Sequence, residues 1–298
     1  MGPRRLTWRW RVIAAIVIVL VRVLRWRIDV RGLEHVPRRG GAVLAFNHHS
    51  YVDFLMVAWP VVRQLRRPLR FLAKREIWSS PRVGWVVRWV EAVPVDRGSA
   101  AARASAFDAA AEALRAGDLV AVAPEQTISP SYELLPLRTG AVRMAQLASV
   151  PIVPVIGWGT QRVLPKGGRA QVRTRLPVTV RFGPPIEVAP DEDPVAATEV
   201  LAARMQELLD QAQRSYPDGT PPGAPWVPAR LGGGAPDHAE VVRAHRERER
   251  GWTPGSGRDD GATPGSGRDE TRPGGQERDD AGPPASGRGG AAATPDTS

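Results

Sequence analysis

The stretch that decides the fold of this chain is GAVLAFNHHSYVDF, residues 41–54. Residues 41–45 are apolar and predict a buried strand, and residues 54–57 continue as an apolar run typical of a helix. His48 and Asp53 are separated by about 500° on an ideal helix, so they can meet only if His48 lies in the loop and Asp53 in the first helical turn. Such a strand-to-helix corner lies at the edge of a sheet, where α/β proteins carry out their chemistry.

Two interpretations of this corner are open. Ser50 and Asp53 fit a capping box, in which Asp53 only satisfies a backbone donor and His48 is an ordinary loop residue. Alternatively, Asp53 holds one nitrogen of the His48 imidazole while the other nitrogen takes a proton from a substrate hydroxyl. The spacing alone does not choose between them.

The charge of the chain is unevenly distributed. Residues 1–100 hold 19 of the 41 basic residues, 6 of the 31 acidic residues and seven of the ten tryptophans. Arginine and tryptophan between apolar runs favour the interface of an anionic phospholipid membrane. No nucleic-acid-binding motif is recognisable, so nucleic acid is not the expected partner. The absence of cysteine excludes disulfides, thiolate metal sites and a cysteine nucleophile.

The N-terminal 30 residues predict a helix that lies in the membrane interface. Residues 12–21 are apolar, which is too short for a bilayer span of roughly 20 residues. A signal peptide is possible, but arginines stand where a small-residue cleavage site would be expected. We therefore expect a monotopic or peripheral anchor on the cytoplasmic face of the cell membrane. An ordinary amphipathic docking helix is the alternative.

Strand-like and helix-like segments alternate through the middle of the chain, which predicts an α/β domain with a mixed sheet flanked by helices. The last helix of this domain is expected to start at Asp193 as N-cap with Pro194 following. From Tyr216 onward, glycine, proline, serine, aspartate and arginine dominate, which predicts disorder apart from a possible short helix near residues 239–246. The expected organisation is therefore an interfacial helix (1–30), an α/β domain (31–215) and a disordered C-terminal tail (216–298).

Four short blocks stand in order at or near the predicted strand ends. They are Asn47-His48-x4-Asp53, Val93-Pro94-Val95-Asp96-Arg97, Pro124-Glu125-Gln126-Thr127 and Val150-Pro151-Ile152-Val153-Pro154. This ordered set resembles the glycerolipid acyltransferase family, best known from 1-acyl-glycerol-3-phosphate acyltransferases. The resemblance covers roughly residues 30–190.

The resemblance implies a role for each block. His48 would be the general base and Asp53 the group that orients it. The residues expected to bind substrate are Asn47, Arg97, Glu125, Thr127 and Arg138. Arg97 would contact the acceptor phosphate. The last block, from Pro151 to Pro154, would be structural or donor-binding, and a core strand is an equally good interpretation.

The third block departs from the family pattern E-G-T-R. Gln126 replaces the glycine and loses its conformational freedom. Ile128 replaces the arginine, so a charge-assisted bond to phosphate must come from elsewhere, with Arg138 or Lys74 as candidates. Otherwise the acceptor is not a simple phosphate monoester.

The expected function is acyl transfer from acyl-CoA or acyl carrier protein to a lysophospholipid, most of all 1-acyl-glycerol-3-phosphate. An acyl thioester is already activated, and no G-x-S-x-G elbow is present, so direct attack without an acyl-enzyme is expected. We expect no cofactor and no metal, although His48, His49 and Asp53 leave a metal hydrolase as an alternative. Acylation of another lipid acceptor and a non-catalytic membrane-surface protein are the remaining alternatives.

Overall fold

The computed structural model describes residues 8–74, 78–79, 81, 84–89, 92–95 and 100–250. The strands in this part of the chain are β1 (Arg27–Arg31), β2 (Ala42–Phe46), β3 (Leu69–Lys74), β4 (Val93–Val95), β5 (Leu119–Val122), β6 (Ile152–Trp158) and β7 (Pro177–Phe182). They form one sheet in the order β1-β7-β6-β2-β5-β3-β4. Neighbouring strands are parallel except β6 and β7, which are antiparallel. The predicted mixed α/β sheet is therefore confirmed.

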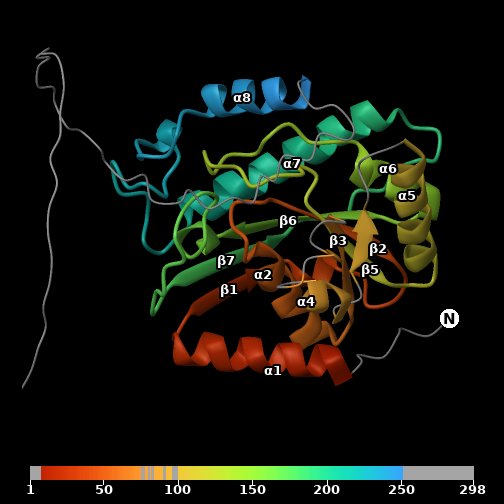
Figure 1. Ribbon diagram of the computed structural model, residues 1–298, viewed down its shortest axis with the longest axis horizontal. Helices are drawn as coiled ribbons and strands as arrows, with labels where there is room; N and C mark the ends of the chain where they lie inside the picture. The colour runs from red at the N-terminus through yellow and green to blue at the C-terminus, as the bar shows by residue number, and fades with distance from the viewer. Residues whose placement is uncertain are drawn as a thin grey trace, which may run out of the picture. The chain divides into compact units, whose positions relative to one another are not determined.

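Helices cover both faces of this sheet (Figure 1). They are α1 (Trp8–Val23), α2 (Asp53–Pro60), α4 (Gly84–Trp89), α5 (Ala100–Arg115), α6 (Gly140–Ala148), α7 (Pro194–Arg214) and α8 (His238–Arg250). The short helical turns are η1 (Leu33–His35), η2 (Val61–Leu65), η3 (Thr160–Arg162) and η4 (Ala229–Leu231). As predicted, Asp193 caps α7, because its carboxylate accepts from the backbone N–H groups of Val195 and Ala196.

The central strand β2 divides the core into two layers. Leu44 and Phe46 pack with α1 and α2, whereas Val43 and Ala45 pack with α5, α6 and α7. This alternation follows from the period of two in a strand, and it makes every residue of β2 buried. The strand that leads to His48 is therefore fixed on both faces.

Helix α1 is buried on one side only. Trp10, Val17 and Val21 are buried in the core layer that also contains residues of α2. Large apolar side chains on its other side are exposed: Val12, Ile16, Val19, Leu20 and Val23. Among the described helices, none has both the length and the apolarity needed to span a bilayer.

The predicted start of the disordered tail is wrong, because the packed structure continues from Tyr216 to Arg250. Tyr216 is buried and donates a hydrogen bond from its hydroxyl to the Pro177 carbonyl at 2.8 Å. The Arg162 guanidinium lies 4.4 Å from the centre of the Trp226 ring. These few aromatic anchors are hidden in a composition dominated by glycine and proline. The rest of the predicted tail, residues 251–298, lies outside the described residues.

Candidate active site

Three adjacent parallel strands bring their carboxyl ends together beside His48. His48 follows β2, Glu125 follows β5 and Thr160 follows β6. The sequence expectation for the corner itself is met, since His48 lies in the loop and Asp53 is the first residue of α2. The carboxyl edge of parallel strands is the usual place for a site in an α/β fold.

His48 and Asp53 form a hydrogen-bonded pair. Nδ1 of His48 lies 3.1 Å from Oδ2 of Asp53. The His48 side chain is 24% exposed, whereas the Asp53 side chain is only 1% exposed. Because an ionised carboxylate can only accept, Nδ1 carries the proton, and Nε2 is left as the basic nitrogen of the ring.

Asp53 also holds the backbone of the corner. Its Oδ2 accepts from the N–H groups of His49 at 2.6 Å and Ser50 at 2.8 Å. Its Oδ1 accepts a short hydrogen bond from the Thr160 hydroxyl. The two sequence interpretations are therefore not exclusive, since one carboxylate satisfies backbone donors and also orients the imidazole. Ser50 is not the N-cap, because α2 starts after Val52 and the Ser50 hydroxyl donates elsewhere.

His49 has surroundings quite different from those of His48. Its ring is fully buried, contacts the Asn47 amide at 3.0 Å and packs edge-on against Trp158. Burial lowers the pKa of His49 to about 4, so the ring is neutral at physiological pH. Within the described residues, no group of three or more histidine and carboxylate side chains is arranged to hold a metal ion.

Asn47 and Glu125 position the corner instead of facing a substrate. Asn47 is fully buried and pairs with the backbone of Gly157, accepting at 2.6 Å and donating at 3.0 Å. Glu125 is fully buried, and its two oxygens accept from the N–H groups of His48 at 2.7 Å and Leu135 at 2.9 Å. The polar atoms of both buried side chains bond within the protein, which favours a supporting role over the expected substrate contact.

Burial raises the pKa of Glu125 to about 8, although the backbone donors Leu135 and His48 oppose this shift by favouring the ionised form. Ser129 makes a second hydrogen bond to the backbone of His48, since its N–H donates to the His48 carbonyl at 2.8 Å. The segment after β5 thus fixes the backbone of His48 from two directions, which limits the movement of its ring.

The remaining residues expected to bind substrate lie in different surroundings, and Arg97 is not among the described residues. The hydroxyl of Thr127 accepts a hydrogen bond from the Lys166 ammonium at 2.9 Å. Arg138 is exposed, and its backbone N–H donates to the Pro124 carbonyl at 3.0 Å. Arg97 lies outside the described residues, and the Lys74 side chain does as well.

The unusual residues of the third block have structural consequences. Gln126 has a φ of 60°, the left-handed conformation in which glycine is favoured. Ile128 is only 4% exposed, so its side chain belongs to the interior of the domain. Residues Ile152 to Pro154 lie at the buried start of β6, which supports the core-strand interpretation of the fourth block.

Sequence reasoning missed the connection between β6 and β7. Thr160 reaches Asp53, the Leu164 carbonyl accepts from Ser50 and Tyr51, and Lys166 reaches Thr127. Lys166 is one of only two lysines in the chain, which is the one signal that sets it apart in the sequence. These contacts span up to 114 residues of sequence, so no local sequence pattern predicts them.

A histidine with one nitrogen held by a buried carboxylate, at the carboxyl edge of a mixed sheet, is an arrangement that general-base sites use. The described residues around it include no cysteine, since the chain has none. Such a site is suited to removing a proton from a hydroxyl group that then attacks an acyl or similar electrophile.

Comparison with known proteins shows similarity to one family. Residues 27–158 match the family model described as Acyltransferase. The 1-acyl-sn-glycerol-3-phosphate acyltransferase of Bacillus subtilis is 29% identical over 197 residues, covering 63% of this chain and 92% of that protein. The chloroplastic 1-acyl-sn-glycerol-3-phosphate acyltransferase of Brassica napus is 28% identical over 143 residues, covering 48% of this chain and 40% of that protein.

The fold is also found in a solved structure, the 1-acyl-sn-glycerophosphate acyltransferase PlsC from Thermotoga maritima. The TM-score is 0.55 at 22% identity, and the match covers 70% of this chain and 80% of that one. Residues 27–158 are therefore similar to the acyltransferase family, in line with the resemblance that the four sequence blocks carry. The chain spans 40% of the length of the Brassica napus relative.

Proposed function

We propose that this protein transfers a fatty acyl group from a thioester to the free hydroxyl of a lysophospholipid. The acceptor is 1-acyl-glycerol-3-phosphate, the product is phosphatidic acid, and the donor is acyl-CoA or acyl carrier protein. The observation that carries the proposal is the 3.1 Å contact between the partly exposed His48 ring and the buried Asp53 carboxylate. The relatives named 1-acyl-sn-glycerol-3-phosphate acyltransferase support the choice of acceptor.

The proposed reaction is a single displacement at the thioester carbonyl. Nε2 of His48 takes the proton of the acceptor hydroxyl while its oxygen bonds to the carbonyl carbon. The carbon–sulfur bond of the resulting tetrahedral intermediate then breaks, and the leaving thiolate takes the proton from the imidazolium. Asp53 stabilises the positive charge that the ring carries between these two steps. No acyl-enzyme forms, in keeping with the absence of cysteine and of a G-x-S-x-G elbow.

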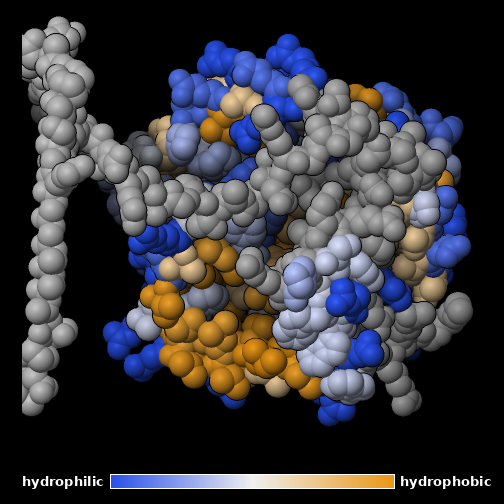
Figure 2. All heavy atoms as spheres, viewed as in Figure 1, coloured by the Kyte–Doolittle hydropathy of each residue, from blue (hydrophilic) through white to orange (hydrophobic). Residues whose placement is uncertain are grey.

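Helix α1 provides the membrane contact in this proposal. Its exposed apolar residues recur every three or four positions from Val12 to Val23, which places them on one side of the helix. Figure 2 shows an apolar surface in the region where Figure 1 places α1. Arg11, Arg22 and Arg25 are exposed on the same helix and its end, where they can reach anionic headgroups.

The opposite side of α1 connects this surface to the site. Trp10 and Val17 belong to the same core layer as Phe54, which follows Asp53 in α2. Trp10, Val17 and Phe54 also line a narrow apolar space between the two helices. A lipid acceptor held at the α1 surface therefore lies next to the helix that carries the carboxylate. We place the protein on the cytoplasmic face of the cell membrane, where thioester donors are present.

The test is a panel of acceptors offered to the purified protein in lipid vesicles. Labelled acyl-CoA and labelled acyl carrier protein are supplied separately, with 1-acyl-glycerol-3-phosphate, glycerol 3-phosphate and 1-acylglycerol as acceptors. Thin-layer chromatography resolves the products. Labelled phosphatidic acid is the expected main product, and transfer to 1-acylglycerol alone would overturn the proposed acceptor. No labelled product from any pair would overturn the proposed enzyme function.

A further inference from the structure

Two basic residues from separate parts of the chain are attached to the loop after β5, beside the catalytic corner. Lys166 belongs to the connection between β6 and β7 and donates to Thr127 at 2.9 Å. Arg138 comes from the segment after β5, where its backbone is bonded to Pro124 at 3.0 Å. Thr127 and Arg138 therefore lie near the two ends of the loop that Glu125 and Ser129 attach to His48.

Lys166 is also tied to the other side of the corner. The Leu164 carbonyl, two residues before Lys166, accepts from the Ser50 hydroxyl at 2.9 Å and from the Tyr51 N–H at 3.1 Å. Lys166 thus stands between the loop of the third block and the loop that carries His48.

Helix α8 adds two more basic groups. Its first residue, His238, contacts the hydroxyl of Ser131 at 2.9 Å, which anchors the helix to the loop after β5. His245 and Arg248 are three residues apart and share one side of α8. The pKa of His245 is lowered first by burial and then by the charges of Arg138, Arg248 and Lys166. The three cations Arg138, Arg248 and Lys166 therefore lie within electrostatic reach of His245, whose lowered pKa keeps its ring mostly neutral at physiological pH.

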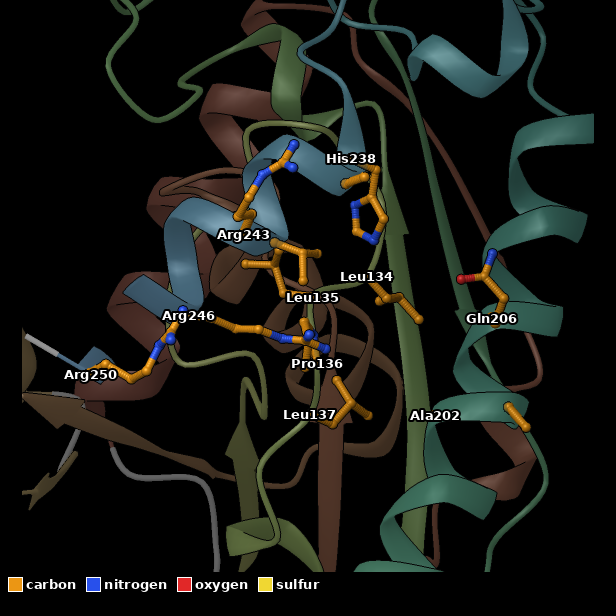
Figure 3. Close-up of a pocket in the computed structure, with 13 residues that line it drawn as sticks. Leu134, Leu135, Pro136, Leu137, Ala202, Gln206, His238, Arg243, Arg246 and Arg250 are labelled. Atoms are coloured by element: carbon orange, nitrogen blue, oxygen red, sulfur yellow. The ribbon is translucent and has the colours of Figure 1, made fainter. Parts of the chain in front are cut away.

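The opposite flank of α8 is different. Arg243, Arg246 and Arg250 line a cavity of about 840 Å³ between α8, α7 and residues 134–137. Figure 3 shows this cavity with Arg246 beside Pro136, and Ala202 and Gln206 on the facing helix α7. The basic residues of α8 thus lie on two opposite sides of the helix. A substitution on the cavity side can therefore serve as a control for a substitution at the His245 side.

We propose that Lys166, with Arg138, His245 and Arg248, forms the binding site for the phosphate monoester of the lipid acceptor. Like charges that gather in this way repel one another, and a phosphate with a charge near −2 relieves that repulsion. In 1-acyl-glycerol-3-phosphate the phosphate and the reacting hydroxyl are on neighbouring carbons, so the phosphate must bind close to His48. Lys166 then supplies the cation that Ile128 does not. This inference rests on the proposed function.

The test compares Lys166→Met with Lys166→Arg and with the control Arg243→Gln on the cavity flank of α8. We expect Lys166→Met to raise the KM for 1-acyl-glycerol-3-phosphate roughly 10-fold or more, since a charge-assisted hydrogen bond is lost. The KM for acyl-CoA and the rate with 1-acylglycerol should stay unchanged. Lys166→Arg should recover most of the affinity, and Arg243→Gln should behave as wild type.

The two proposals fail in different ways. An unchanged acceptor KM in Lys166→Met, or a rise in the KM for acyl-CoA alone, would overturn the phosphate site while leaving acyl transfer in place. A binding measurement decides the matter even for an inactive protein. Glycerol 3-phosphate should raise the melting temperature of the wild type and of Arg243→Gln but not that of Lys166→Met, and equal shifts in all three would overturn the site.

Discussion

Asp53→Asn separates the charge of Asp53 from its hydrogen bonds. The asparagine oxygen can still accept from His48, His49 and Ser50, and the amide NH2 that replaces Oδ1 can donate to the Thr160 hydroxyl, which then acts as the acceptor. The main loss is therefore the negative charge. At an effective dielectric constant of about 20, unit charges 3.1 Å apart attract by about 5 kcal/mol. That attraction favours the imidazolium formed during proton transfer. Its loss predicts a fall in kcat of about 10³-fold or more, at about 1.4 kcal/mol per factor of ten.

The assay is steady-state acyl transfer from labelled acyl-CoA, with melting curves run on the same preparations. Thr160→Val is the matched control, because it removes a hydrogen bond to Oδ1 of Asp53 and keeps the charge. It should cost no more than about tenfold in kcat, in line with about 1 kcal/mol for one hydrogen bond. If folded Asp53→Asn retained more than a tenth of the wild-type kcat, the assignment of Asp53 as the stabilising charge would be refuted.

Three further predictions follow from the geometry. Gln126→Gly should be more stable than Gln126→Ala by about 1 kcal/mol in chemical denaturation, because φ is 60° there; the reverse order would contradict a strained backbone. Because burial raises the pKa of Glu125 from 4.5 to about 8, the folded protein holds a proton that the unfolded chain releases. Wild type should therefore lose stability relative to Glu125→Gln by up to about 1.4 kcal/mol per pH unit between these values, and a pH-independent difference in melting curves would argue against it. Ile16→Glu with Val19→Glu should weaken vesicle binding in a flotation assay by about tenfold or more, whereas Val195→Glu, at a valine of α7 that is about as exposed as Val19, should not; equal effects would rule out α1 as the contact.

The catalytic corner could be predicted from the sequence because its determinants are local. The apolar run of β2 and the spacing of His48 and Asp53 lie within a dozen residues, so periodicity and turn geometry are enough to place them. The mixed sheet could be expected for a similar reason, since each strand and helix has its own apolar pattern. The order of the strands depends on contacts between distant segments.

The supporting residues could not be predicted in this way. Thr160 and Lys166 reach the corner only because β6 lies next to β2 in the sheet, which a linear pattern does not reveal. Asn47 and Glu125 are polar residues beside a reactive histidine, and sequence alone favours substrate contact for both. The structure buries them against backbone donors and acceptors, as a buried polar group requires.

Amino-acid composition gave the wrong position for the end of the folded region, which extends past Tyr216 to Arg250. The segment after Tyr216 is rich in glycine and proline, and this average predicts disorder. Tyr216, Trp226 and Val227 are too few to change the average, yet Tyr216 and Val227 are buried and Trp226 contacts Arg162. Burial of a few large side chains is enough to order the chain as far as α8.

Measuring acyl transfer by His48→Ala is the most direct test of the assignment of His48 as the general base. The variant should fold, bind vesicles as wild type does, and transfer labelled acyl groups at least about 10²-fold more slowly, which is the usual contribution of a general base. Wild-type transfer by a preparation matched for vesicle binding would contradict the assignment of His48 as the base, and with it the proposed mechanism.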